Sequence, residues 1–206
     1  MWGYLEIKRI IDILMSALAC IFISPVFIFI FCVIYIVDGA FPIYRQIRVG
    51  SAGRYFTCYK FRTMVADADR ALSHWQAENA PLFKQYRQGN FKLPQDPRVT
   101  PLGRFLRRHS LDELPQLFNV LRGDMALVGP RPLLPEEVAD YGENIVHYLK
   151  VTPGLTGLWQ VSGRSETSFL DRSDFDLAYI RQKSLWLDFI IILKTVRIVF
   201  SGRGAY

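Results

Sequence analysis

The stretch DPRVTPLGRFLRRHSLDELPQLFNVLRGDMALVGPR, residues 96–131, carries the most informative pattern in this 206-residue chain. It places two adjacent carboxylates, Asp112 and Glu113, among six arginines: Arg98, Arg104, Arg107, Arg108, Arg122 and Arg131. A guanidinium group matches the geometry of phosphate oxygens, while a carboxylate can hold a divalent cation or attack phosphorus. The pattern therefore favours a site that handles phosphate.

A purely structural interpretation of the same residues is also open. Ser110 and Glu113 have the spacing of a helix capping box, in which each side chain bonds the backbone N–H of the other. Asp112 would then only complement the helix dipole. The stretch predicts helices at residues 101–109 and 111–121, the second ended by Gly123, and a short strand at 125–129.

An apolar run without a charged side chain covers residues 13–37. As a helix it would measure about 37 Å, enough to cross a hydrocarbon core of about 30 Å. Ser24 and Pro25 lie at its middle, where proline removes a backbone donor, and basic residues flank both ends: Lys8, Arg9, Arg45 and Arg48. Because positive charge marks the cytoplasmic side, we expect a re-entrant hairpin with both ends in the cytoplasm. A proline-kinked span is the alternative.

The remaining segments predict a mostly helical α/β protein. Residues 43–64 alternate around two glycines as a β-hairpin does; we expect helices at 65–79 and 167–183 and a polar loop at 81–97. Charged residues interrupt 185–200, so this segment favours an amphipathic helix in the membrane interface, with a buried core helix as the alternative. We expect a membrane-anchoring segment at residues 1–40 and a compact cytoplasmic catalytic domain at 41–206.

The net charge of +6 favours an anionic partner: nucleic acid, a membrane surface or a phosphorylated substrate. A nucleic-acid module would interleave basic residues with stacking aromatics and would not need paired acids, so we do not expect nucleic acid. The three cysteines, Cys20, Cys32 and Cys58, lack the spacing of metal ligands. The chain is therefore expected to face a reducing compartment.

Several motifs resemble those of one known family. They are KRIID at 8–12, the Ser24-Pro25 pair, KFRTM at 60–64, the stretch 96–132 and TPGLTGLWQVSGR at 152–164. With these motifs the chain resembles the bacterial sugar transferases, the monotopic phosphoglycosyl transferases. It is most similar to those that transfer galactose phosphate to undecaprenyl phosphate in exopolysaccharide and O-antigen synthesis. The sequence shows no large multi-span N-terminal extension, so we expect the catalytic-core form.

This resemblance implies that a hexose-1-phosphate passes from a UDP-sugar to undecaprenyl phosphate, with release of UMP. Asp112 would be the nucleophile that forms a phosphosugar intermediate, and Glu113 would be catalytic as a ligand of Mg²⁺. The implied substrate-binding residues are Lys60, Arg107, Arg131 and Arg164. UDP-galactose is the expected donor, with UDP-glucose as the alternative; a non-catalytic scaffold for polysaccharide assembly is the rival from another class.

The resemblance also implies a place in the cell. We expect the protein at the cytoplasmic face of the bacterial inner membrane, in contact with membrane lipids. A homodimer is compatible with this position. A phosphosugar must move there from a soluble donor to a carrier whose phosphate lies at the level of the lipid headgroups.

Overall fold

The computed structural model describes residues 3–88, 93, 95–162 and 169–201. Within them the chain is mostly helical, with two small sheets of two strands each. In chain order the elements are α1 (Tyr4–Asp38), β1 (Ile43–Val49), η1 (Ser51–Gly53), β2 (Tyr55–Phe61), α2 (Ala68–Ala77), α3 (Pro81–Gln88), α4 (Pro101–Arg108), η2 (Leu111–Glu113), α5 (Gln116–Arg122), β3 (Ala126–Val128), η3 (Pro135–Glu137), η4 (Ala139–Asn144), α6 (Ile145–Tyr148), β4 (Gly154–Thr156), α7 (Leu158–Ser162), α8 (Phe169–Gln182) and α9 (Leu185–Ser201).

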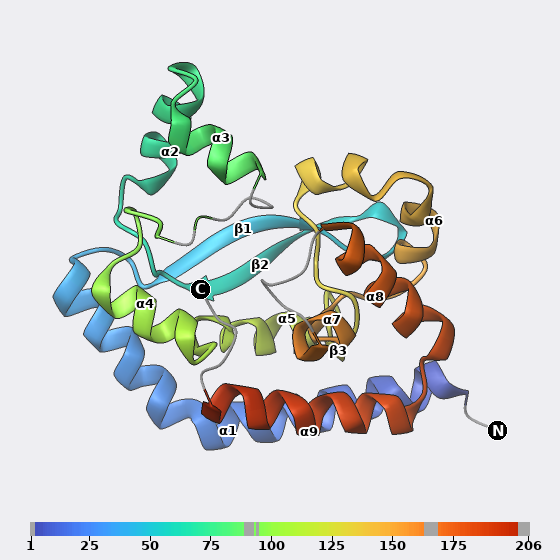
Figure 1. Cartoon of the computed structure of the whole chain (residues 1–206). Coiled ribbons are helices and arrows are strands. Elements are labelled where there is room, and N and C mark those ends of the chain that lie inside the picture. The colour runs from blue at the N-terminus through green and yellow to red at the C-terminus, as the bar shows by residue number, and fades with distance from the viewer. Residues whose placement is uncertain (1–2, 89–92, 94, 163–168, 202–206) are drawn as a thin grey trace.

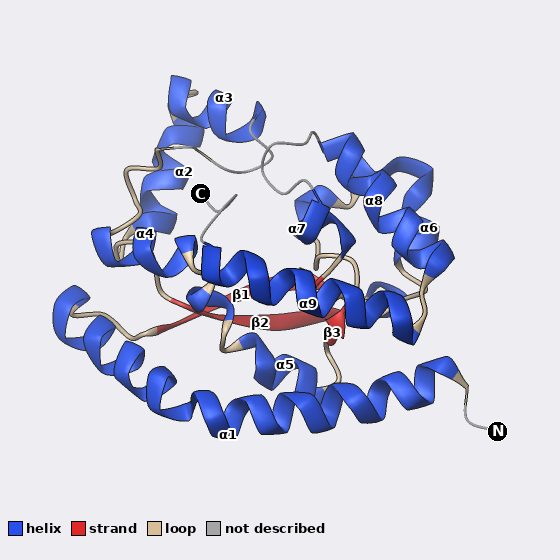
Figure 2. Ribbon diagram, turned by 60° about the horizontal axis from the view of Figure 1, so that its bottom comes forward, coloured by secondary structure: helices blue, strands red, loops and turns tan. Residues whose placement is uncertain are grey.

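The first helix, α1, continues through Pro25 and bends part-way along its length (Figures 1 and 2). Proline has no N–H to donate to the carbonyl four residues earlier, which here belongs to Ile21. The hydroxyl of Ser24 donates to that carbonyl instead, at 2.8 Å. The Ser-Pro pair thus bends the helix while keeping its backbone bonded. The structure has one bent helix where the sequence predicted two limbs, and its path in a membrane stays a prediction.

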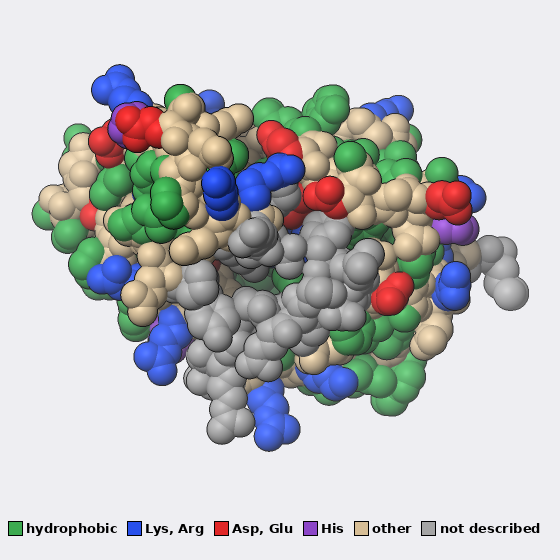
Figure 3. All heavy atoms as spheres, turned by 45° about the horizontal axis from the view of Figure 1, so that its top comes forward, with side chains coloured by type: hydrophobic (Ala, Val, Ile, Leu, Met, Phe, Trp, Pro, Cys, Tyr) green, Lys and Arg blue, Asp and Glu red, His purple; other side chains and the backbone are tan. Residues whose placement is uncertain are grey.

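The exposed sides of α1 and α9 form an apolar face. α1 is long and apolar enough to cross a membrane, and only 11% of its most apolar window is buried. α9 packs Ile191 inward but exposes large side chains on its other side: Trp186, Phe189, Leu193 and Val196. A buried core helix would not expose this second side, so α9 differs from that alternative. The two helices lie along the same side of the molecule (Figure 1), whereas the opposite side carries acidic and basic side chains among apolar ones (Figure 3).

Two sets of polar contacts hold the N-terminal half of α1 against the rest of the chain. Lys8 Nζ lies 2.8 Å from Oδ2 of Asp188 on α9. Arg9 donates to the carbonyls of Val120 and Leu121, at 2.6 and 2.9 Å, where α5 ends. The C-terminal half packs through apolar side chains, Ile30 and Ile34 lying with Phe61 and Leu106 in one core cluster. Both ends of α1 therefore contact the same body.

The β-hairpin is confirmed, with β1 and β2 antiparallel from Ile43↔Phe61 to Val49↔Tyr55. Asn119 of α5 fixes its position: its Oδ1 accepts from Tyr59 N–H at 3.1 Å, and its Nδ2 donates to the Thr57 carbonyl at 2.7 Å. Just beyond β2, α4 approaches so closely that a Cβ at Gly103 would lie 2.0 Å from the Thr63 carbonyl oxygen. Only glycine allows this contact.

The helices predicted at 65–79 and 101–109 are present as α2 and α4. Those predicted at 167–183 and 185–200 are present as α8, over its described residues, and as α9. The strand predicted at 125–129 is β3, and it pairs in parallel with β4. The polar loop predicted at 81–97 was wrong in its first half, where α3 forms. Tyr86 of α3 and Trp75 of α2 both stack on the guanidinium of Arg98, at 5.4 and 4.9 Å. This tertiary contact has no counterpart in local hydrophobic periodicity.

Candidate active site

The acidic pair lies in η2, a single turn of 3-10 helix between α4 and α5. The predicted helix at 111–121 was therefore wrong at its start: α5 begins only at Gln116. Pro115 explains the difference, because it has no N–H with which to bond the carbonyl of Leu111 in a continuous α-helix. Ser110 adopts a left-handed conformation, with φ of 54°, and its side chain makes no capping bond. The capping-box interpretation is thus wrong.

Glu113 instead points its carboxylate at two cations. Its Oε1 lies 2.8 Å from Nζ of Lys60 on β2 and 3.5 Å from a terminal guanidinium nitrogen of Arg131. Lys60 and Arg131 stand 53 and 18 residues from Glu113 in the sequence. The fold therefore brings together three residues that the sequence placed in one site.

Asp112 is buried, with 8% of its surface exposed. Burial and the neighbouring charge of Glu113 raise the pKa of Asp112, while Lys60, Arg107 and Arg131 act to lower it. Arg107 is fixed by a 3.0 Å bond from its Nε to Oγ1 of Thr63. Burial lowers the pKa of Arg107, and the charge of Asp112 opposes that shift. Asp112 is therefore a desolvated carboxyl group within the field of several cations.

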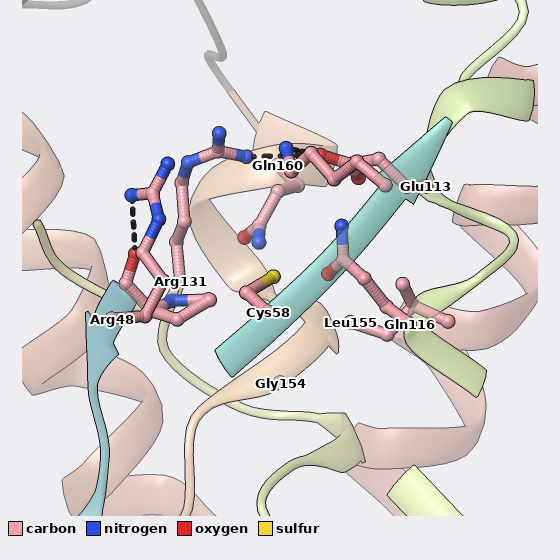
Figure 4. A pocket seen from close by; sticks show the side chains of 10 residues that line it. Arg48, Cys58, Glu113, Gln116, Arg131, Gly154, Leu155 and Gln160 are labelled. Atoms are coloured by element: carbon pink, nitrogen blue, oxygen red, sulfur yellow. Dashed lines mark hydrogen bonds and ion pairs between the residues drawn. The ribbon is translucent and has the colours of Figure 1, made fainter. Parts of the chain in front are cut away.

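A small pocket opens beside this pair (Figure 4). Arg131 and Glu113 lie across its upper side in that view, joined by their ion pair, and Cys58 and Leu155 lie below them. The lining residues come from β1, β2, η2, α5, the loop after β3, β4 and α7: Arg48, Cys58, Lys60, Glu113, Gln116, Arg131, Pro132, Gly154, Leu155 and Gln160. Four of the lining residues, Arg48, Lys60, Glu113 and Arg131, carry charge, and the others are neutral.

Buried side chains bind the backbone from Arg131 to Leu134. Tyr148 donates its hydroxyl to the Arg131 carbonyl at 3.0 Å and accepts from Leu133 N–H at 3.2 Å. Arg48 donates to the Pro132 carbonyl at 3.0 Å. A carboxylate oxygen of Glu137 accepts from Leu134 N–H at 2.7 Å. Because buried partners hold these backbone groups, the backbone that carries the Arg131 side chain is fixed, and this positions the guanidinium group near Glu113.

The structure places the predicted site residues as follows. Asp112, Glu113, Lys60, Arg107 and Arg131 gather around η2, whereas Arg164 lies outside the described residues. Asp124, which follows the acidic pair in the sequence, lies 3.5 Å from Arg122.

Besides Lys60, Glu113 and Arg131, the pocket is lined by residues outside the predicted site: Arg48, Cys58, Gln116, Pro132, Gly154, Leu155 and Gln160. For two of them, the position in the sequence relative to a predicted site residue indicated a place near the site. Cys58 lies two residues before Lys60 on β2, so both side chains point to the same face of the strand. Gln116 lies three residues after Glu113.

The acidic pair offers oxygen ligands for a divalent cation. No group of three His, Cys, Asp or Glu side chains suited to a metal occurs among the described residues. Mg²⁺ is commonly held by one or two carboxylates together with substrate phosphates and water, so Asp112 and Glu113 fit such a partial site. Burial, followed by the charge of Glu113, raises the pKa of Asp112, and a bound cation would favour its ionised form.

A buried acid beside a second acid, within the field of Lys60, Arg107 and Arg131, has the chemistry to act on a phosphate group. Comparison with known sequences agrees. The chain belongs to the bacterial sugar transferase family, whose profile matches residues 3–202.

Individual relatives resemble nearly the whole chain. An undecaprenyl-phosphate galactose phosphotransferase of Salmonella typhimurium is 45% identical over 97% of this chain and 42% of its own length. The exopolysaccharide production protein ExoY of Sinorhizobium fredii is 43% identical over 97% of this chain and 88% of its own. A UDP-glucose:undecaprenyl-phosphate glucose-1-phosphate transferase of Klebsiella pneumoniae is 40% identical, over 97% and 41%. The chain thus spans less than half of the first and third relatives.

Proposed function

We propose that this protein transfers a hexose-1-phosphate from a UDP-sugar to undecaprenyl phosphate and releases UMP. The observation that carries the proposal is Asp112, buried next to Glu113 within the field of Lys60, Arg107 and Arg131. The names of the Salmonella and Klebsiella relatives, which describe transfer to undecaprenyl phosphate, support it further.

In the first step a carboxylate oxygen of Asp112 attacks the β-phosphorus of the UDP-sugar. A new bond forms between that oxygen and phosphorus, and the bond from phosphorus to the bridging oxygen breaks, so that UMP leaves with the electron pair. In the second step a phosphate oxygen of undecaprenyl phosphate attacks the same phosphorus and returns the carboxylate of Asp112. The route predicts ping-pong kinetics.

The surrounding cations suit this chemistry because phosphoryl transfer depends mainly on positioning and on stabilising charge. Arg131 and Arg107 would stabilise negative oxygens of the diphosphate, since guanidinium groups match their geometry. Lys60 would stay near Glu113 and help to keep Asp112 ionised. Mg²⁺, held by Glu113 and phosphate oxygens, would offset further charge on the diphosphate when bound.

The apolar face supports a position at the membrane surface, with the catalytic residues on the cytoplasmic side. A straight crossing of α1 would carry its N-terminal half out of the cytoplasm, yet Lys8 contacts Asp188 and Arg9 contacts the end of α5. Those contacts and the bend next to Ser24 support a re-entrant path, in which both ends of α1 stay on one side. The site would then stand where a lipid-linked phosphate lies.

We propose UDP-galactose as donor, with UDP-glucose as the alternative; the names of the Salmonella and Klebsiella relatives support one each. The test is release of UMP by purified protein with undecaprenyl phosphate and each of a panel of UDP-sugars. Repeated turnover to UMP that requires undecaprenyl phosphate as well as the UDP-sugar supports the proposal. Failure of every donor would contradict it and would favour the scaffold role.

A further inference from the structure

A buried amide in the pocket has no assigned role. Gln116, in the first turn of α5, exposes 3% of its surface. Its Nε2 has no hydrogen-bond partner among the described residues. Buried donors are nearly always paired, and one left unpaired is costly. The side chain lines the pocket and is directed toward its interior (Figure 4). A ligand that enters the pocket would supply the missing acceptor.

The charge of the pocket indicates which part of a ligand Gln116 meets. The cationic groups that suit phosphate oxygens, Lys60 and Arg131, are paired to Glu113 along one side. Gln116 itself is neutral, and so are Cys58, Pro132, Gly154, Leu155 and Gln160 in the lining. A phosphate would prefer the cationic groups, whereas a neutral hydroxyl group can accept a bond from an amide. Hydroxyl groups are what a sugar ring offers beside its phosphate.

We propose that Gln116 recognises the hexose of the donor, donating from Nε2 to one of its hydroxyl oxygens. This inference rests on the proposed function and names a residue for sugar selection at the same site. Gln116 lies three residues beyond Glu113 and four beyond Asp112, so it would contact the sugar while the acidic pair faces the phosphate. Selection would follow because a site built to bond a hydroxyl rejects a ligand that lacks it.

Equilibrium binding tests the proposal without requiring turnover. The protein would carry Asp112→Asn to prevent reaction, and binding of the UDP-hexose would be compared with binding of UDP. We expect Gln116→Met, which keeps the length of the side chain and removes the donor, to weaken UDP-hexose binding roughly tenfold and to leave UDP binding unchanged. Gln116→Glu, which replaces the donor by an acceptor, should do the same. Gln85→Met, on the exposed side of α3, is the control.

The outcomes separate this inference from the proposed function. Equal weakening of UDP-hexose and UDP, or no weakening of either, would overturn the role of Gln116 in sugar recognition. If Gln116→Met weakens binding of UDP-hexose alone while protein with Asp112 intact releases no UMP, that result would support the role of Gln116 and contradict only the transfer reaction. If UDP-hexose binds no better than UDP when Gln116 is intact, the pocket does not recognise the sugar and the inference fails. Thermal unfolding of each variant would reveal a merely structural role, which would lower stability and spare the selectivity.

Discussion

The ammonium group of Lys60 on β2 lies 2.8 Å from Oε1 of Glu113 in η2, joining the hairpin to the acidic turn across 53 residues. This pair compensates the charge of one acid directly beside Asp112. Lys60 also lowers the pKa of Asp112, against the effects of burial and of Glu113, which raise it. The ionisation of the proposed nucleophile therefore depends on a lysine from a distant strand.

Replacing Lys60 tests that dependence. An attacking carboxylate must be ionised, so kcat/KM should fall as pH drops through the pKa of Asp112. Lys60→Met removes a cation that favours the ionised form; the pKa rises further, and the acidic limb of the profile should move to higher pH. Lys84→Met, on the exposed side of α3, should leave the profile unchanged. An acidic limb at the same pH in Lys60→Met would show that Lys60 does not control this ionisation.

The contact of Asn119 with β2 predicts a loss of stability. Asn119→Ala leaves Tyr59 N–H and the Thr57 carbonyl without their bonds from this fully buried side chain. Each buried polar group left unpaired costs about 1–3 kcal/mol, so the free energy of unfolding should fall by about 2 kcal/mol or more. Thermal unfolding in detergent or nanodiscs measures it.

The exposed Arg122 on the same helix provides the control for Asn119. Its nitrogen lies 3.5 Å from Asp124 at the surface, where ion pairs contribute little, so Arg122→Ala should scarcely change the melting temperature. Equal effects of the two substitutions would mean that Asn119 does not anchor the hairpin.

The bend at Ser24-Pro25 predicts the topology of α1. Labels at Gly3 and Gly50 should both react only from the cytoplasmic side. Pro25→Leu restores an N–H for the Ile21 carbonyl and favours a straight helix, so the label at Gly3 should become accessible from outside. Val26→Leu, one residue further on, should preserve the original pattern. A wild-type N-terminus in the periplasm would reject the re-entrant path.

Chelation tests the metal. EDTA should abolish turnover and added Mg²⁺ should restore it, because the acidic pair and the diphosphate would share the cation. Glu113→Gln removes a proposed ligand and should raise the Mg²⁺ concentration needed for half-maximal rate. Glu143→Gln, an exposed acid in η4, should not. Full activity in chelator would remove Mg²⁺ from the mechanism.

The local sequence pattern predicted several of these features because their causes are local. Alternation around two glycines predicted the β-hairpin, and the adjacent acids among arginines predicted the candidate site. Other features depend on tertiary contacts that no local pattern contains. Periodicity could not reveal α3, which packs on Arg98 through Tyr86.

The helix predicted at 111–121 was wrong at its start because Pro115 lacks the N–H that a continuous α-helix needs there. The resemblance, rather than spacing, pointed to Lys60. Gln116 lies only three residues after Glu113, but its burial in the pocket depends on how β2, α5 and β4 meet.

Mass spectrometry of the protein quenched after mixing with UDP-sugar, without lipid acceptor, tests the central role of Asp112 most directly. We expect an adduct of hexose-phosphate mass on the peptide that contains Asp112, formed together with UMP and lost on addition of undecaprenyl phosphate. Asp112→Asn should form no adduct and lose several orders of magnitude in turnover. It should remain folded, because a buried amide of similar shape replaces a carboxyl whose ionised form is already disfavoured by burial. An active enzyme that never carries the adduct, with rates requiring both substrates bound at once, would contradict the covalent mechanism.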